Sequence, residues 1–424
     1  MKRRTLAALA ALALVACASC ASKPRIRDPI AAFYAADAAY TSAYFHAYAE
    51  LNDDSVALAL NEYATAELAL GDQRDSRNAF VDAGRIMGNF DGSTLETLGA
   101  VIGQESSKRW KGDPYEVAMN SFYAALLYYM RGEYDNALAG CKNGILAGGD
   151  ADEGYRSDFT LLYWFEGKCS EKLGRPDASR QSFDEARKSR ERRGDADVLE
   201  SEGLFDPSRN ATFVIDLGIG PRKIAGGEHG EIVQFERGQY PEAFAEVRVD
   251  GRVVGRSVEM VDLHWQATHR GGKEIDGIRE GKAVFKTVAN VAGVAALIAA
   301  SAQENQRHQD QLAIAGLSLL ALSLLTSAEA DTRCWLTLPG AVHALSAEVE
   351  PGLHAVEIDF FDARGGSLPG MRQVWHDVPF EAGRENVFYF RSGPRRADTT
   401  YPAGEIDPAL RASSATAALP GTPR

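Results

Sequence analysis

The sequence contains few cysteines and histidines, and it lacks the short motifs of common hydrolases. It has five cysteines and eight histidines among 424 residues. Neither His-Glu-x-x-His nor Gly-x-Ser-x-Gly occurs, and His264 and His269 stand five residues apart, out of register for one helix face. A calcium loop starting at Asp150 would need glutamate at its twelfth position, where Leu161 stands. The sequence therefore predicts no catalytic, cofactor-binding or metal-binding residues, and no enzyme activity.

Positive charge is also scarce. Lys and Arg total 46 against 59 Asp and Glu, which gives a net charge of −13. Residues 1–16 hold three basic and no acidic residues, so the chain without them carries −16. Such acidity disfavours nucleic acid and anionic lipid headgroups as partners. The glycines of 218–221 do not indicate a nucleotide site, because Pro221 removes an amide that a phosphate would need and no helical pattern follows.

Long apolar runs are absent beyond residue 16. No run there reaches the 18 or more apolar residues expected of a membrane-spanning helix, so the body of the protein is predicted to lie outside the bilayer. The composition, 45% hydrophobic and 25% charged, is ordinary for a globular protein. The length suggests two or three domains.

The N-terminus has the anatomy of an export signal. Lys2, Arg3 and Arg4 precede an uncharged stretch rich in Leu and Ala, which ends in Leu14-Val15-Ala16-Cys17. This ending resembles the bacterial lipoprotein box, in which a small residue precedes an obligatory cysteine. The resemblance implies a signal peptide at residues 1–16, lipidation of Cys17 and a linker at 17–28. An ordinary cleaved signal that loses Cys17 is one alternative, and Cys20 is a weaker candidate for the lipid.

Residues 29–192 are predicted to form helical hairpins. Pro29 suits the first position of a helix. Gly71, Gly132 and Gly174 each follow one helical stretch and precede another, at points where a positive φ is useful. They are 61 and 42 residues apart, whereas a regular tetratricopeptide array repeats every 34 or so, which indicates degenerate repeats with insertions. Since such repeats form concave surfaces, protein binding is the expected use, and pure scaffolding is the alternative.

Residues 205–392 change to the alternating pattern of strands. Residues 212–217, 353–361, 371–380 and 385–391 read as strands, and 246–254 reads as a hairpin with an Asp-Gly turn. Several short strands separated by Gly and Pro turns predict an antiparallel β-sandwich. Residues 393–424 are rich in Pro, Ala, Ser and Thr and are predicted to be disordered.

An apolar insert, residues 277–330, divides the strands. Its two uncharged runs, 288–302 and 312–328, would span roughly 22 and 26 Å as helices, short of the ~30 Å of a hydrocarbon core. A hairpin packed on the sandwich is the first interpretation, and a membrane- or partner-inserting hairpin is the second. The following segment, 331–339, is expected to attach this hairpin to the next strand, and a site formed by its Asp/Arg pair beside a tryptophan is the alternative. Whether Cys141 and Cys169 form a disulfide is left open by their spacing.

Taken in order, scattered motifs resemble a family of bacterial envelope lipoproteins with degenerate tetratricopeptide-like repeats. They cover roughly residues 30–392 and comprise Asn61-Glu62-Tyr63, Gly71-Asp72, Asp113-Pro114-Tyr115-Glu116, Gly132-Glu133-Tyr134 with Ala137, Gly220-Pro221-Arg222-Lys223, Asp331-Thr332-Arg333, Trp335 and Leu338-Pro339. The resemblance implies localisation and architecture, not a reaction.

The predicted fold class is therefore multidomain α+β, with tetratricopeptide-like α-hairpins followed by an antiparallel β-sandwich that carries an apolar helical hairpin. The predicted function is that of a lipid-anchored, non-catalytic binding or assembly module for envelope proteins, with cell-wall or outer-membrane machinery as a sub-hypothesis. The alternative is a membrane-active or secretion-associated component that uses residues 288–328. Because Ala18 follows Cys17, the usual sorting rule of Gram-negative bacteria favours the periplasmic face of the outer membrane.

Overall fold

The computed structural model describes the helical and strand regions but not the N-terminal signal or the apolar insert. The described residues are 28–88, 109–148, 158–193, 203–226, 232–270, 273–274, 331–393 and 396–400. Cys17, Cys20, the insert at 277–330 and the linker up to residue 27 lie outside them. The predictions made for those segments therefore stay predictions.

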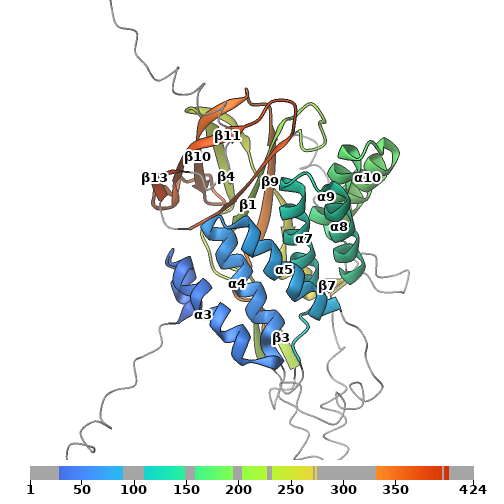
Figure 1. The fold of residues 1–424 in the computed structure, drawn as a ribbon, viewed down its shortest axis with the longest axis vertical. Coiled ribbons are helices and arrows are strands. Elements are labelled where there is room, and N and C mark those ends of the chain that lie inside the picture. Colours follow the sequence, from blue (N-terminus) through green and yellow to red (C-terminus); the bar gives the residue numbers. More distant parts are fainter. Residues whose placement is uncertain are drawn as a thin grey trace, which may run out of the picture.

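Helices occupy the first half of the described chain and lie beside one another across the sheets (Figure 1). α4 packs on α5, α7 on α8, and α9 on α10, each pair as a hairpin of consecutive helices. The helices are α2 (Pro29–Tyr34), α3 (Ala38–Leu51), α4 (Val56–Leu70), α5 (Gln73–Gly88), α7 (Pro114–Met130), α8 (Tyr134–Gly148), α9 (Thr160–Lys172) and α10 (Pro176–Arg193), with a short α11 (Leu263–Thr268) among the strands.

The glycines expected between the helices take the conformation that the sequence indicates. Gly71, Gly132 and Gly174 have φ of 87°, 77° and 68°, in the left-handed region that favours glycine. Each lies between the two helices of a hairpin. The prediction of helical hairpins punctuated by these residues is confirmed.

The first helix is shorter than the spacing of its aromatic residues suggests. The pattern from Ile30 to Leu51 is helical, yet the structure breaks it at Ala36, whose φ is 64°. Asp37 then begins α3, because its carboxylate accepts a hydrogen bond from the Tyr40 main-chain nitrogen at 3.2 Å. A run of alanines gives no sequence signal for this break, since alanine favours helix.

The second half forms two larger sheets and two small hairpins. One sheet has the order β12-β1-β9-β6 and the other β13-β11-β10-β4-β5; β2 pairs with β3, and β7 with β8. The strands are β1 (Ala211–Leu217), β2 (Arg222–Gly226), β3 (Ile232–Glu236), β4 (Phe244–Val249), β5 (Arg252–Arg256), β6 (Val258–Asp262), β7 (His269–Arg270), β8 (Lys273–Glu274), β9 (Ala341–Ala347), β10 (Gly352–Phe361), β11 (Gln373–Phe380), β12 (Asn386–Arg391) and β13 (Arg396–Thr400).

Most strand pairs are antiparallel, as predicted, but two are not. β12 runs parallel to β1, and β13 runs parallel to β11, because the chain crosses between the two sheets after β11 and again after β12. β13 also corrects the expectation for residues 393–424, since 396–400 form a strand within that tail. Composition alone predicted disorder there, because it does not show that one edge of β11 is available to pair with residues 396–400.

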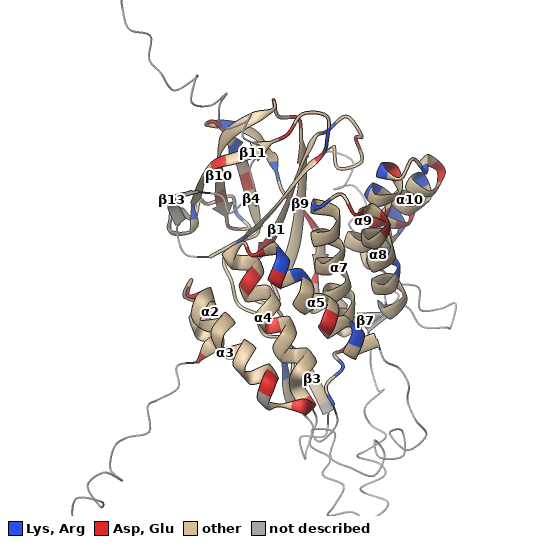
Figure 2. Cartoon of the chain, in the orientation of Figure 1, with Lys and Arg blue, Asp and Glu red and all other residues tan. Residues whose placement is uncertain are grey.

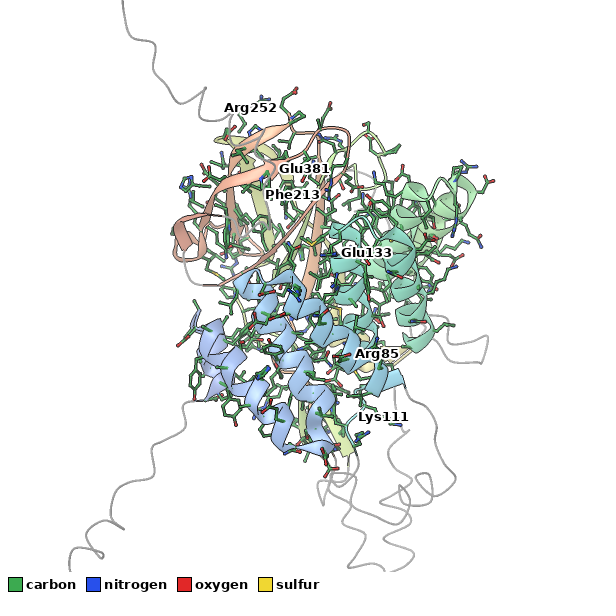
Figure 3. All side chains as sticks on the ribbon, viewed as in Figure 1. Arg85, Lys111, Glu133, Phe213, Arg252 and Glu381 are labelled. Atoms are coloured by element: carbon green, nitrogen blue, oxygen red, sulfur yellow. The ribbon has the colours of Figure 1, made fainter. Side chains whose placement is uncertain are left out.

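The described elements form three layers: helices, the four-stranded sheet and the five-stranded sheet. All seven residues of β1 are buried, as expected for a strand covered on both faces. On one face, Phe213 packs against Phe380, Phe388 and Phe390 between the two sheets (Figure 3). On the other face, Val214 belongs to the core that the helices share with the sheet. The helical and strand halves are therefore joined by a continuous apolar core.

Candidate functional site

The layer between the helices and the sheets contains buried charged groups. Carboxylates, lysines and arginines from α4, α7, α9 and the strands meet there in separate clusters, at positions closed to water. Charged residues are rarely buried unless they are paired. This layer is therefore the candidate functional site.

The first cluster holds residues 331–338, the segment that leaves the apolar insert and passes between α4 and α7. Glu62 of α4 accepts hydrogen bonds from the main-chain nitrogens of Leu336 and Thr337, at 2.7 and 3.0 Å, one on each oxygen. Burial raises the pKa of Glu62 to about 7, although these hydrogen bonds oppose the rise. Because both oxygens already accept main-chain donors, the carboxylate fixes the segment rather than facing a substrate.

Glu116 of α7 holds the same segment one residue earlier. Its Oε1 accepts from the Trp335 main-chain nitrogen at 2.7 Å, and its Oε2 accepts from Lys223 Nζ at 2.9 Å. Lys223 also lies 3.2 Å from Asp113 Oδ2. Burial raises the pKa of Glu116 against the opposing effect of Lys223. Burial alone would lower the pKa of Lys223, but the two carboxylates outweigh it and raise that pKa.

The side chain of Trp335 completes the attachment of this segment. It is fully buried, and its indole nitrogen donates to the hydroxyls of Thr65 and Thr337 at 3.1 and 3.0 Å. Its ring lies 5.7 Å from that of Phe80 and 6.0 Å from that of Tyr123. The sequence predicted that 331–339 attaches the insert to the following strand. In the structure this segment contacts α4 and α7, and also Lys223 of β2 through the Arg333 carbonyl, while the insert itself lies outside the described residues.

A second cluster surrounds Asp216 on β1. The hydroxyls of Tyr123 and Tyr389 both donate to its Oδ2 at 2.7 Å, and Arg391 Nη1 lies 3.3 Å from the same oxygen. Burial raises the pKa of Asp216, while Arg391 and the two hydroxyls oppose the rise. The cluster joins α7 to β1 and β12.

A third cluster surrounds Glu385, just before β12. Lys168 Nζ lies 2.7 Å from one of its oxygens and Lys172 Nζ lies 3.1 Å from the other. Tyr129 and Thr212 donate their hydroxyls to it, both at 2.7 Å. Burial alone would raise the pKa of Glu385, but the two lysines outweigh it and lower the pKa to about 2. This carboxylate is therefore an ionised partner of α9.

Through these contacts, the first helix of each hairpin binds other parts of the same chain. α4, α7 and α9 are the first helices of their hairpins, and each directs polar side chains to the sheets or to residues 331–338. The sequence predicted that a concave repeat surface would bind another protein. That stays a prediction; the sides of α4, α7 and α9 that carry these side chains contact residues of the same chain.

Only some residues of these clusters belong to the motifs noted in the sequence. Glu62, Glu116 and Lys223 belong to those motifs, whereas Asp216 and Glu385 carried no signal. A glutamate inside the apolar stretch of α4 is a sign of a buried partner, since Lys and Glu are almost never buried unpaired. Nothing in the sequence names that partner, which lies more than 200 residues away.

The other residues considered in the sequence, a glycine, two histidines and the cysteines, make structural contacts in the described part of the chain. Gly220 donates its main-chain N–H to the carbonyl of Leu338 at 2.8 Å, so this amide is already engaged. His264 lies 3.3 Å from the carbonyl of Phe235, and the His269 ring stacks on Trp265. Cys141 and Cys169 are free, buried thiols, as is Cys334. Burial raises the pKa of Cys141.

The described residues contain neither a membrane-spanning helix nor a metal-binding cluster. In that part of the chain, no helix combines the length and apolar character needed to cross a membrane. Over the same ranges, no group of three His, Cys, Asp or Glu side chains is placed to hold a metal ion.

The fold defines the protein as a member of the mixed α+β class, in which helical hairpins cover a sheet of a two-sheet body. No protein-family model and no curated protein matches the chain. The solved structures to which the chain is similar include two described as crystal structures of MamA protein and of MamA. The first is 16% identical, covers 38% of this chain and 69% of that one, and has a TM-score of 0.26. The second is 15% identical, covers 40% and 98%, and has a TM-score of 0.22. At these scores the likeness supports no argument about this chain.

Proposed function

We propose that this protein is a lipid-anchored, non-catalytic assembly module of the bacterial cell envelope, built on degenerate tetratricopeptide-like hairpins. One observation carries the proposal: α4, α7 and α9 direct polar side chains to residues of the same chain, and the exposed sides of α5, α8 and α10 remain. The buried side of α10 also reaches β6, where Arg190 and Arg193 contact Glu259. The non-catalytic role is supported by the buried carboxylates, whose contacts hold helices, strands and residues 331–338 together.

The outward surface of α5, α8 and α10 is the proposed site for other envelope proteins. Acidic and basic side chains alternate on α10, as Figure 2 shows, in pairs such as Arg180 with Asp177 and Lys188 with Glu185. Leu146 on α8 is 74% exposed. A mixed polar surface with an isolated apolar side chain suits a reversible contact with another protein.

The anchor belongs to the same proposal. A diacylglycerol on Cys17 would hold the body beside a bilayer, joined by the linker that ends at residue 28. Ala18 favours the periplasmic face of the outer membrane in a Gram-negative host. The proposed partners are therefore other envelope proteins, with no nucleic acid among them.

Site-specific photo-crosslinking in the native envelope tests this function. The lipidated, full-length protein carries a photoreactive residue in place of Leu146, and a matched control carries it in place of Val253 on β5, which is 50% exposed. We expect a discrete crosslinked protein from position 146 and none from position 253. Crosslinks from position 253 alone would refute the outer-helix surface. Their absence from both positions would refute the assembly role of these faces.

A further inference from the structure

α3 is a helix at the edge of the molecule that carries almost no charge. It packs on α2 and α4 and lies away from the sheets (Figure 1). Glu50 is the one Asp, Glu, Lys or Arg among its 14 residues, whereas ten of the 18 residues of α10 are of these types. A surface helix ordinarily turns charged and polar side chains to water, so α3 is unusual for its position.

The polar side chains of α3 point inward instead. The Thr41 hydroxyl donates to the Pro29 carbonyl at 2.8 Å, and the Ser42 hydroxyl donates to the carboxylate of Glu67 on α4. Both hydroxyl residues are buried. The exposed residues of α3 are mainly small and apolar: Ala39, Ala43, His46, Ala47 and Glu50. With hydroxyls inside and apolar groups outside, α3 reverses the ordinary pattern of a surface helix.

A row of half-buried aromatic rings lies beside this exposed side. Tyr40, Tyr44 and Tyr48 are four residues apart, which places them along one side of the helix. The rings of Tyr44 and Tyr48 stack at 6.1 Å, and Phe45 meets them edge-on at 5.2 and 6.4 Å. A tyrosine has an apolar ring and a polar hydroxyl, and tyrosines are enriched where lipid headgroups meet acyl chains. The row therefore suits a surface that is apolar on one side and wet on the other.

The position of α3 along the chain favours a bilayer as that surface. α2 begins at Pro29, so residues 18–28 alone separate the helices from Cys17, which the proposed function places in the membrane. A stretch of that length spans at most about 40 Å. α2 and α3 are therefore the elements that the proposed anchor would keep nearest to the membrane.

Charge selects the kind of lipid. The chain carries −13, and α3 offers no basic residue to an anionic headgroup. Anionic lipids would therefore repel the protein and gain no contact with α3. A zwitterionic headgroup such as phosphatidylcholine avoids that repulsion.

We propose that the uncharged, tyrosine-rich outer side of α3 rests on the headgroup region of a neutral phospholipid bilayer. The proposal rests on the proposed anchor, because a shallow contact of this kind holds a protein stably only when a second attachment keeps it at the membrane. α10, part of the proposed protein-binding surface, lies at the opposite edge of the molecule (Figure 1). The two contacts can therefore be made at the same time.

Photo-crosslinking to lipid tests the contact. The complete chain from residue 17, with Cys17→Ser and a hexahistidine tag at its N-terminus, is bound to phosphatidylcholine vesicles that contain a nickel-chelating lipid. This attachment replaces the native anchor, so the result does not depend on acylation of Cys17. A photoreactive residue replaces Ala43, and in the matched control it replaces Ala139, which is exposed on α8. We expect phospholipid adducts from position 43 in about tenfold higher yield than from position 139.

Each other outcome overturns the proposal in a recognisable way. Equal yields from the two positions, or no lipid adduct from either, would show that α3 is not the face that meets the bilayer. Adducts of position 43 with a second copy of the chain, in place of lipid, would assign this side of α3 to a dimer. The anchor is read separately, from flotation of the native protein with phosphatidylcholine vesicles that lack the chelating lipid. Absence of flotation would refute the anchor and leave the crosslinking result standing.

A charge placed on the same side tests its apolar character. The photoreactive residue is moved to position 47, and Ala43→Glu is compared with Ala139→Glu, the same change on α8. We expect Ala43→Glu to lower the yield of lipid adducts by about tenfold, because its carboxylate would lose water on contact with the bilayer. Ala139→Glu should leave the yield unchanged, and both variants should unfold at the same urea concentration as the parent. An unchanged yield in folded Ala43→Glu would overturn the assignment of this side to lipid.

Discussion

The carboxylate of Glu385 shows how single charges are used inside this protein. It is 5% exposed, and Lys168 beside it is 4% exposed. Replacing Glu385 by Gln would leave that ammonium without an opposite charge, which typically costs about 3–5 kcal/mol of unfolding free energy. We expect a loss of this size in urea denaturation of the Glu385→Gln variant.

Glu133→Gln is the matched control for that substitution. Glu133 also sits beside two basic groups, Arg131 and Arg77, but at the surface (Figure 3), where water screens the charges. Its loss should cost about 1 kcal/mol or less. Equal losses for the two variants would show that the buried cluster contributes no more than a surface pair.

The same carboxylate predicts how stability depends on pH. Its pKa is about 2 in the folded protein against an ordinary 4.5. The ionised form is therefore favoured by folding, and its contribution is complete above pH 4.5 and is lost as the pH falls from 4.5 towards 2. The contribution is about 3 kcal/mol. Urea denaturation at several pH values should show the gap between parent and Glu385→Gln narrowing over this range; a constant gap would contradict the assignment.

The buried thiols predict a chemical test at the same scale. Cys141 and Cys169 are free and inaccessible, and burial disfavours the reactive thiolate of Cys141. We expect iodoacetamide to leave both unmodified in the native protein and to modify both in urea, as read by peptide mass spectrometry. Modification in the native state, or a disulfide between them in protein purified from its envelope, would contradict the structure.

At the scale of elements, residues 331–338 act as a buried connection between helices and strands. Trp335 fills space beside Phe80 and Tyr123 and donates to two threonines. Trp335→Ala should cost about 3–5 kcal/mol of unfolding free energy because it leaves a cavity and two hydroxyls without their donor. Thr332→Ala, an exposed position in the same segment, should change it by about 0.5 kcal/mol or less. Similar losses for both would contradict the described attachment.

The sequence predicted the elements better than their partners. β1 and the β4–β5 hairpin were predicted because alternation and an Asp-Gly turn are local signals, and Asp250 and Gly251 do adopt positive φ. The break at Ala36 was missed because its cause, the cap from Asp37, competes with a strong local preference for helix.

The candidate site was less predictable than the elements, because its contacts join residues far apart in the sequence and leave no local signal. Glu62 and Trp335 are recognisable as unusual residues, but their hydrogen bonds, to Leu336 and Thr65, join segments at least 270 residues apart in sequence. Asp216 and Glu385 look like ordinary surface acids until β1 is covered by α7. Burial of a charge is a property of the assembled layers, and no local pattern encodes it.

For the whole molecule, the three-layer arrangement means that the helical half packs on the rest of the chain. The repeat pattern alone suggests a helical half that is free to bind partners. A free solenoid uses its concave face for partners. Here Glu62, Glu116 and Lys168 engage residues 335–337 and Glu385 of the same chain, so the proposed contacts with other proteins would lie on the second helices. Proteins bound there would sit on the side of the helices opposite the sheets.

The last prediction concerns the position of this molecule in the cell, and it follows from the cysteine at the end of the signal. If Cys17 carries the lipid, Cys17→Ser should abolish incorporation of labelled palmitate, block the normal processing of residues 1–16 and reduce the amount of protein recovered with outer membranes. Cys20→Ser is the matched control, because it changes the neighbouring thiol and should leave all three measurements unchanged. Normal processing and undiminished membrane recovery of Cys17→Ser would refute the anchor, and the same defects in Cys20→Ser alone would move the lipid to that residue. Either result would leave the three layers intact but would remove the bilayer as the surface beside which the outer helices meet their partners.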